Sequence, residues 1–169
     1  MSWIKTVPYE EADGKLKTLY DRVKGPDNNV DNIMMSHSLR PHTMVGHMTI
    51  YQNVLHHSGN TIPKWFLEAL GVWVSALNGC DYCVEHHFGG MKRLLADDPR
   101  SEALRTAIEG GEITNAPLDA AQKQAMAYAQ KLTRHPQAMV EADVDALRNA
   151  GYSDGEILEI NQVSAYFNY

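Results

Sequence analysis

The sequence predicts an all-α fold, and two observations carry that prediction. No stretch shows the alternation of apolar and polar residues, bounded by turn residues, that is typical of a β-strand. Apolar residues instead recur three and four positions apart, as on one face of a helix, and segments rich in glycine, proline and asparagine separate these runs. With 169 residues, of which 44% are hydrophobic and 21% charged, the chain can bury a core, and we expect a single domain over residues 1–169.

Three helices are expected in the first third of the chain. The first spans about residues 9–24, and its apolar face carries Leu16, Leu19, Tyr20 and Val23. Gly25 and Pro26 end it, since they combine a C-terminal glycine with a residue that cannot continue a helix. A short helix follows over residues 31–39, and Pro41 opens another that runs to about His57.

The middle of the chain predicts two helices joined by a tight turn. The first begins around Pro63, which is tolerated in a first turn, and it is apolar almost all round from Trp65 to Leu77. Such a helix is normally central in the fold. Asn78-Gly79 is the expected C-cap, and the next helix begins at Cys80 or Asp81 and runs to Ala96.

Four further helices are expected after Asp97-Asp98-Pro99. The first ends near Gly110-Gly111, and the second covers about residues 118–133. The third covers residues 143–149, and the fourth runs from Ser153 to the end of the chain. Ser153 and Glu156 have the spacing of a capping box. The last helix reaches Tyr169 without a cap or a polar tail, so we expect the natural chain to extend further.

Charge and composition exclude several functions. With 15 basic and 21 acidic residues the formal net charge is -6, which is a poor match for nucleic acid or for an anionic membrane surface. No apolar run reaches the roughly 18 residues of a membrane span. Charged residues occupy the start of the chain, where a signal peptide needs an apolar segment, so we expect a cytoplasmic protein.

Both cysteines of the chain lie within four residues, as Cys80-Asp-Tyr-Cys83. Two cysteines are too few for a disulfide scaffold. At positions i and i+3 on the first turn of a helix, two sulfurs approach closely enough for a disulfide. The N–H groups at a helix start also stabilise a thiolate, so we expect a lowered thiol pKa there. We therefore favour a redox or metal-binding pair over two buried apolar residues.

Two residues near the cysteines are candidates for a proton relay. His87 follows Cys83 by four residues, so both lie on one helix face, and the imidazole can take the thiol proton. Glu68 is the one charged residue between Trp65 and Asn78, and a lone carboxylate in such a helix is costly to bury unless it is paired or protonated. If the chain folds back at Asn78-Gly79, Glu68 reaches His87 and Cys83.

Two neighbouring residues are further candidates. His86 lies at i+3 from Cys83, and we expect a solvated side chain there. Tyr82, between the cysteines, is placed either to donate a hydrogen bond to a peroxide or thiolate or simply to pack.

This set of residues resembles the alkylhydroperoxidase D-like (AhpD-like) group of the carboxymuconolactone decarboxylase superfamily, and within it the peroxidase-related branch. The resemblance lies in Glu68, then 11 residues, then Cys80-x-x-Cys83, then three residues and His87. Supporting similarity extends to residues 74–87, residues 131–136, residues 143–151 and residues 164–168. One departure is Tyr82, where well-known members carry histidine.

The resemblance implies an AhpD-like helical bundle that forms a homo-oligomer, a trimer or a hexamer, and reduces small hydroperoxides. It implies that Cys83 attacks the peroxide and that Cys80, the more exposed thiol, closes a redox-active Cys80–Cys83 disulfide. Glu68 and His87 would form the proton relay. No cofactor or metal is implied; the disulfide would be reduced again by a dithiol protein of the lipoyl-bearing or thioredoxin-like kind.

Two alternatives stay open beside this prediction. One is a decarboxylase-like or lactone-processing enzyme of the same superfamily, although such proteins do not generally need the CxxC pair. The other is a non-catalytic metal-binding or structural protein. Zinc would need a fourth ligand beside Cys80, Cys83 and His87, drawn from His47, His56 or His57.

Overall fold

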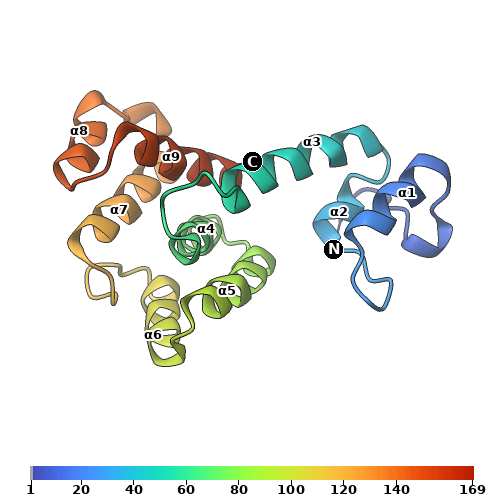
Figure 1. Ribbon diagram of the computed structural model, residues 1–169, viewed down its shortest axis with the longest axis horizontal. Coiled ribbons are helices and arrows are strands. Elements are labelled where there is room, and N and C mark those ends of the chain that lie inside the picture. Colours follow the sequence, from blue (N-terminus) through green and yellow to red (C-terminus); the bar gives the residue numbers. More distant parts are fainter. Residues whose placement is uncertain (1) are drawn as a thin grey trace. The chain divides into compact units, whose positions relative to one another are not determined.

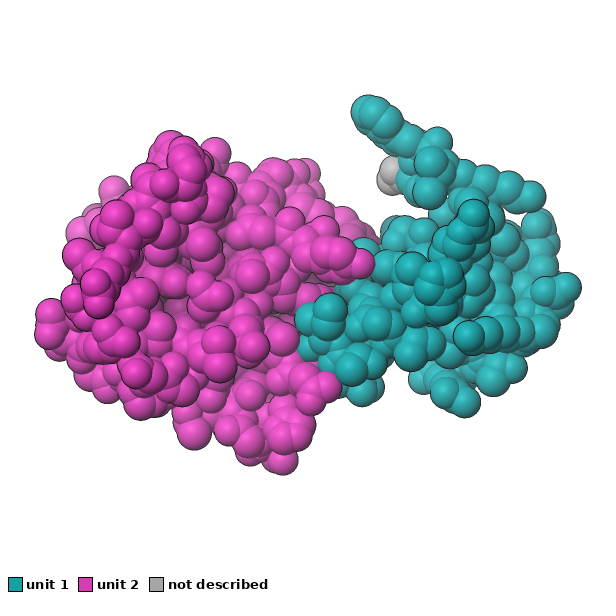
Figure 2. Space-filling view, turned by 90° about the horizontal axis from the view of Figure 1, so that it is seen from above, with its two compact units in different colours: residues 1–52 teal, residues 53–169 magenta. Residues whose placement is uncertain are grey.

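The computed structural model describes residues 2–169, and within them all regular structure is helical. The helices fall into two compact units, residues 1–52 and residues 53–169 (Figure 2). The predicted all-α class is therefore confirmed. Within the described residues no helix is long and apolar enough to cross a membrane.

The first unit contains three α-helices and a short 3₁₀ turn. The helices are α1 (Gly14–Val23), α2 (Asn32–Ser36) and α3 (Pro41–Tyr51), and the 3₁₀ turn is Tyr9–Glu11. Their core consists of Leu16, Tyr20, Val30, Met34 and Met44. The Tyr20 hydroxyl donates to the Val7 carbonyl at 2.8 Å, and the Val7 N–H donates to the Ser38 hydroxyl at 3.0 Å. These bonds hold the extended N-terminal segment against the unit.

Two predicted helices of the first unit are interrupted. The expected helix over residues 9–24 breaks at Ala12 and Asp13, which are extended, and α1 begins only at Gly14, whose φ is +46°. The expected helix from Pro41 to His57 ends as α-helix at Tyr51 and continues as a π-helical turn, Gln52–His56. Apolar spacing does not reveal either change, because a local change of hydrogen-bond pattern leaves the apolar residues in place.

The second unit is built around α4 (Lys64–Leu77). Figure 1 shows this helix end-on, surrounded by α5 (Asp81–Leu95), α6 (Asp98–Glu109), α7 (Ala120–Arg134) and α9 (Asp154–Asn168). A 3₁₀ turn (Pro136–Ala138) and α8 (Glu141–Asn149) connect α7 to α9. Ten consecutive residues of α4, Phe66–Ser75, are buried, as an apolar surface on all sides requires. The prediction that this helix is central is confirmed.

Polar contacts hold α4 among its neighbours. The Trp73 indole N–H donates to the Met126 carbonyl of α7 at 3.1 Å. The carboxylate of Glu159, on α9, accepts from the backbone N–H groups of Thr61 and Ile62 at 2.9–3.1 Å, just before α4 begins. Hydrogen bonds thus fix α4 both just before its first residue and within the helix.

Most predicted helix ends in this unit are confirmed within two residues. Ser153 caps α9 and forms the predicted capping box with Glu156. Asp119 caps α7, and Asp97 caps α6. The helix expected over residues 143–149 begins at Glu141, because the Asp143 carboxylate accepts from the Val140 N–H at 2.8 Å and so caps a start two residues earlier.

Two buried or partly buried histidines of the first unit make its stability depend on pH. The rings of His37 and His47 lie 5.1 Å apart. Burial lowers the pKa of both from the ordinary 6.5, and the charge of His37 lowers that of His47 further. The folded state therefore binds fewer protons than the unfolded state as the pH falls through 6.5, so this contribution to stability is complete well above that value and is lost progressively as the pH falls through it.

We expect the free energy of unfolding in urea to fall between about pH 7.5 and 5.5, and to fall less in a His47→Gln variant. The lowered carboxyl pKa values of the chain act only at more acidic pH, below about 4.5. His42→Gln, an exposed position on the same helix, is the matched control and should keep the parent's pH dependence. An identical slope in His47→Gln and the parent would contradict the prediction.

Candidate active site

The turn between α4 and α5 places the first cysteine. Asn78 is the C-cap of α4, and Gly79 follows with a φ of +68°, a conformation that favours glycine. The Cys80 N–H donates to the Ser75 carbonyl at 2.9 Å, and the Gly79 N–H donates to the Ala76 carbonyl at 3.1 Å. These two bonds are the Schellman motif, so the predicted C-cap is confirmed and the chain reverses directly before Cys80.

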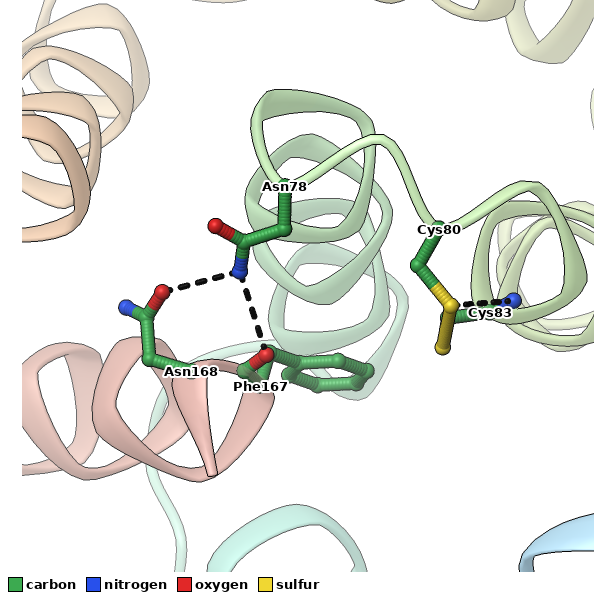
Figure 3. Close-up of a disulfide and its surroundings, with 5 residues drawn as sticks. All are labelled: Asn78, Cys80, Cys83, Phe167 and Asn168. Carbon is green, nitrogen blue, oxygen red and sulfur yellow. Dashed lines mark hydrogen bonds between the residues drawn. A yellow bond between two sulfur atoms is a disulfide. The ribbon is translucent and has the colours of Figure 1, made fainter. Parts of the chain in front are cut away.

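Cys80 ends that motif and also begins the next helix. It is the N-cap of α5, and its sulfur accepts from the Cys83 N–H at 3.4 Å. The two cysteines form a disulfide, with their Cα atoms 5.4 Å apart (Figure 3). Both residues are partly buried, so exposure does not distinguish one thiol from the other.

The reversal brings Glu68 and His87 together. Nδ1 of His87 lies 2.7 Å from Oε2 of Glu68, 19 residues earlier in the chain. The Glu68 side chain is 5% exposed and the His87 side chain 12% exposed. The buried carboxylate thus has the partner that burial requires, and the predicted contact between these two residues is present.

The carboxylate sets the tautomer of His87. An ionised carboxylate only accepts hydrogen bonds, so Nδ1 carries the proton and donates it to Glu68. In the neutral ring the lone pair then lies on Nε2. A histidine held in this way is oriented as a proton acceptor, with the carboxylate able to stabilise the charge that it gains. The predicted approach of this pair to Cys83 stays a prediction.

Gly90 allows the close approach of α5 to Glu68. A Cβ atom at position 90 would lie 3.2 Å from both Cδ and Oε1 of the Glu68 side chain. Gly89 has open space at the same point. Of the two consecutive glycines, the second is therefore the one that the site requires.

His56 is a further ionisable group that interacts electrostatically with the pair. It ends the π-helical turn, and its carbonyl accepts from Nζ of Lys64, which lies one helical turn before Glu68 on the same face of α4. Burial lowers the pKa of His56; the charge of Glu68 opposes this effect, and Lys64, His87 and Arg93 add to it. From the sequence, His56 is a candidate only as a zinc ligand, because no spacing rule links it to Glu68.

The two remaining predicted residues lie at the edge of the site. Tyr82 is 41% exposed, and its ring stacks on that of His86 with the centroids 6.0 Å apart. His86 is exposed, as expected, and its ring lies edge-on to that of His87 at 5.3 Å. Both residues thus belong to the exposed face of the first turns of α5.

The described residues of this site do not form a metal centre. Within residues 2–169, no group of three or more histidine, cysteine, aspartate or glutamate side chains could hold a metal ion. A depression of about 230 Å³ lies beside α5 and is lined by Ala76, Asp81, Val84, Glu85 and Glu109. That lining includes neither cysteine nor His87, so the depression is not the site described above.

Gly90→Ala and Gly89→Ala test the packing of α5 against Glu68. We expect Gly89→Ala to raise the free energy of unfolding by about 0.5–1 kcal/mol, because alanine favours an exposed helix position. Gly90→Ala should raise the free energy of unfolding by less, or should lower it, because the buried Glu68 carboxylate must move by a few tenths of an ångström. Urea unfolding at neutral pH measures both, and equal stabilisation by the two variants would contradict the packing described.

Solved structures resemble this chain over nearly its whole length, whereas no family model and no curated protein matches it. An uncharacterized peroxidase-related protein from Silicibacter sp. TM1040 shares 25% sequence identity with a TM-score of 0.79; the match covers 99% of this chain and 88% of that one. An alkylhydroperoxidase AhpD core, an uncharacterized peroxidase-related protein from Ralstonia eutropha JMP134, has a TM-score of 0.78 at 21% identity, over 96% and 83% of the two chains. The chain therefore has the AhpD-like fold of peroxidase-related proteins.

Proposed function

We propose that this protein is a thiol-dependent peroxidase that reduces small hydroperoxides through Cys80 and Cys83. The observation that carries the proposal is the buried hydrogen bond between Glu68 of α4 and His87 of α5, the helix whose first turn holds the disulfide. A structural cysteine pair has no need of a buried, carboxylate-oriented histidine one turn away. The AhpD-like fold and the peroxidase-related neighbours support the same class of activity.

In the first step Cys83 is the nucleophile. His87 takes the thiol proton, and the thiolate attacks the terminal oxygen of the hydroperoxide. A sulfur–oxygen bond forms while the oxygen–oxygen bond breaks, and the departing alkoxide takes a proton from His87 to leave as an alcohol. Sulfur loses two electrons and the peroxide gains them, so the product on the protein is a sulfenic acid at Cys83.

In the second step Cys80 resolves the sulfenic acid. Its sulfur lies at the N-cap of α5, where the Cys83 N–H donates to it and the helix dipole favours negative charge. The Cys80 thiol gives up its proton, and its thiolate attacks the sulfur of Cys83. The disulfide forms while the sulfur–oxygen bond breaks, and the departing hydroxide takes up that proton and leaves as water. Cα atoms 5.4 Å apart meet the geometric requirement for this bond, so the helix need not open.

The cycle then needs two electrons from outside. A dithiol exchanges with the Cys80–Cys83 disulfide through a mixed disulfide, becomes a disulfide itself and releases both thiols. We propose a lipoyl-bearing or thioredoxin-like protein as this reductant, and a homo-oligomer, either a trimer or a hexamer, as the working form. No bound cofactor takes part in these steps.

The thiol count tests the proposal directly. The reduced protein should show two free thiols, lose both on addition of one equivalent of hydroperoxide, and regain both with dithiothreitol. Cys83→Ser should abolish peroxide consumption, whereas Cys80→Ser should accumulate a sulfenic acid that dimedone traps. Thiols that do not respond to peroxide, or a Cys83→Ser variant as active as the parent, would refute the peroxidase proposal.

Glu68→Gln tests the relay. The amide can still contact His87, but it does not stabilise an imidazolium charge as a carboxylate does. We expect the rate constant for sulfenic acid formation to fall by about 10- to 100-fold, within the reach of an oriented proton-transfer group. Stopped-flow tryptophan fluorescence or competition for peroxide measures it. Glu102→Gln, an exposed carboxylate on α6, is the control; a parent-like rate in Glu68→Gln would remove Glu68 from the mechanism.

A further inference from the structure

The end of the last helix packs directly on His87. The ring of Phe167 meets the His87 imidazole edge-on, with the centroids 4.5 Å apart and the planes at 84°. This geometry is the favourable T-shaped arrangement of two aromatic rings. Besides the neighbouring His86 ring, His87 therefore contacts the Glu68 carboxylate at Nδ1 and the Phe167 ring.

Gly71 provides the space for that ring. A Cβ atom at position 71 would collide with Cζ, Cε2 and Cε1 of Phe167. Gly71 lies in the buried middle of α4, three residues after Glu68, so it occupies nearly the same face of the helix. The tip of the Phe167 ring thus fills a notch in α4 beside the carboxylate that orients His87.

The backbone around Phe167 is tied to the turn that carries Cys80. Nδ2 of Asn78 lies 2.9 Å from Oδ1 of Asn168 and 3.4 Å from the Phe167 carbonyl (Figure 3). The Asn168 amide donates in turn to the Thr133 hydroxyl at 3.0 Å and to the Ser164 carbonyl at 2.9 Å. The C-terminal end of α9 is therefore bound to α7 and to Asn78, at the start of the turn that carries Cys80. These bonds fix the backbone from which the Phe167 side chain projects.

We propose that Phe167 is a positioning residue for His87. Its ring blocks rotation of the imidazole away from Glu68 and keeps water from one side of the Glu68–His87 pair. This inference rests on the proposed peroxidase function for its kinetic consequence, whereas its effect on the imidazole is independent of any activity.

Two variants test this contact, one by replacing the Phe167 ring and the other by filling the space that the ring occupies. Phe167→Leu keeps an apolar side chain but loses the aromatic contact, and Gly71→Ala expels the ring while alanine itself favours the helix. Each should lower the rate constant for sulfenic acid formation by roughly tenfold, with little change in peroxide affinity, as expected of a displaced catalytic group. The double variant should lose no more than the worse single variant, because both act through one ring.

The ¹⁵N spectrum of His87 separates positioning from general stability. In the parent protein the imidazole should show the single tautomer protonated at Nδ1, whereas Phe167→Leu should show the averaged nitrogen shifts of a ring that exchanges tautomers. Circular dichroism establishes that each variant is folded at the temperature used. Leu158→Ala, an exposed position on the same helix, is the control and should match the parent in both spectrum and rate.

Phe167→Tyr adds a second independent test. Because Cζ of the ring lies against α4 at Gly71, a tyrosine hydroxyl would have to enter the helix, so this variant should resemble Phe167→Leu rather than the parent. A parent-like His87 spectrum in Phe167→Leu, or an altered spectrum with an unchanged peroxide rate, would overturn the proposal. If the parent itself fails to react with peroxide, the proposed function falls, and the spectrum still decides whether Phe167 positions His87.

Discussion

The hydrogen bond between Glu68 and His87 is the interaction on which the site depends. A carboxylate in the middle of the most buried helix of the chain is unfavourable unless a partner compensates it. The partner arrives because the chain reverses within three residues at Asn78, Gly79 and Cys80, which lays the first turns of α5 alongside α4. The same reversal that satisfies Glu68 therefore also fixes the positions of both cysteines.

Two glycines, which have no side chain, allow neighbouring groups to pack closely around this hydrogen bond. Gly90 lets α5 come within contact of the Glu68 carboxylate, and Gly71 makes room for the ring of Phe167. Both are helix-interior glycines, which cost helix stability relative to alanine. Their positions are explained by what packs on them, whereas Gly79 is explained by its positive φ. Three glycines thus serve one site for two different physical reasons.

The arrangement separates a rigid part of the site from an accessible part. Glu68 and His87 lie on the buried side, where a low dielectric strengthens their interaction. Tyr82 and His86 lie on the exposed side of the same helix, with the partly buried disulfide at its start. A thiol pair that must meet both a small oxidant and a second dithiol needs this combination, since exchange requires access and proton transfer requires orientation.

The sequence by itself determined the all-α class, the central helix, the turn at Asn78-Gly79 and the cysteine, histidine and glutamate positions, because helical periodicity, caps and one lone carboxylate are local signals. It also predicted that Glu68 and His87 meet, because a buried charge needs a partner. Only the tertiary structure decided the break before α1, the π-helical turn at Gln52–His56, the electrostatic interaction of His56 with Glu68 and the contact of Phe167 with His87. The contact of Phe167 with His87 joins residues 80 positions apart, and Gly71, which makes room for the ring, lies 96 positions from Phe167; no spacing along a single helix encodes such contacts. The two helix interruptions are local changes of the hydrogen-bond pattern, which leave the apolar spacing in place.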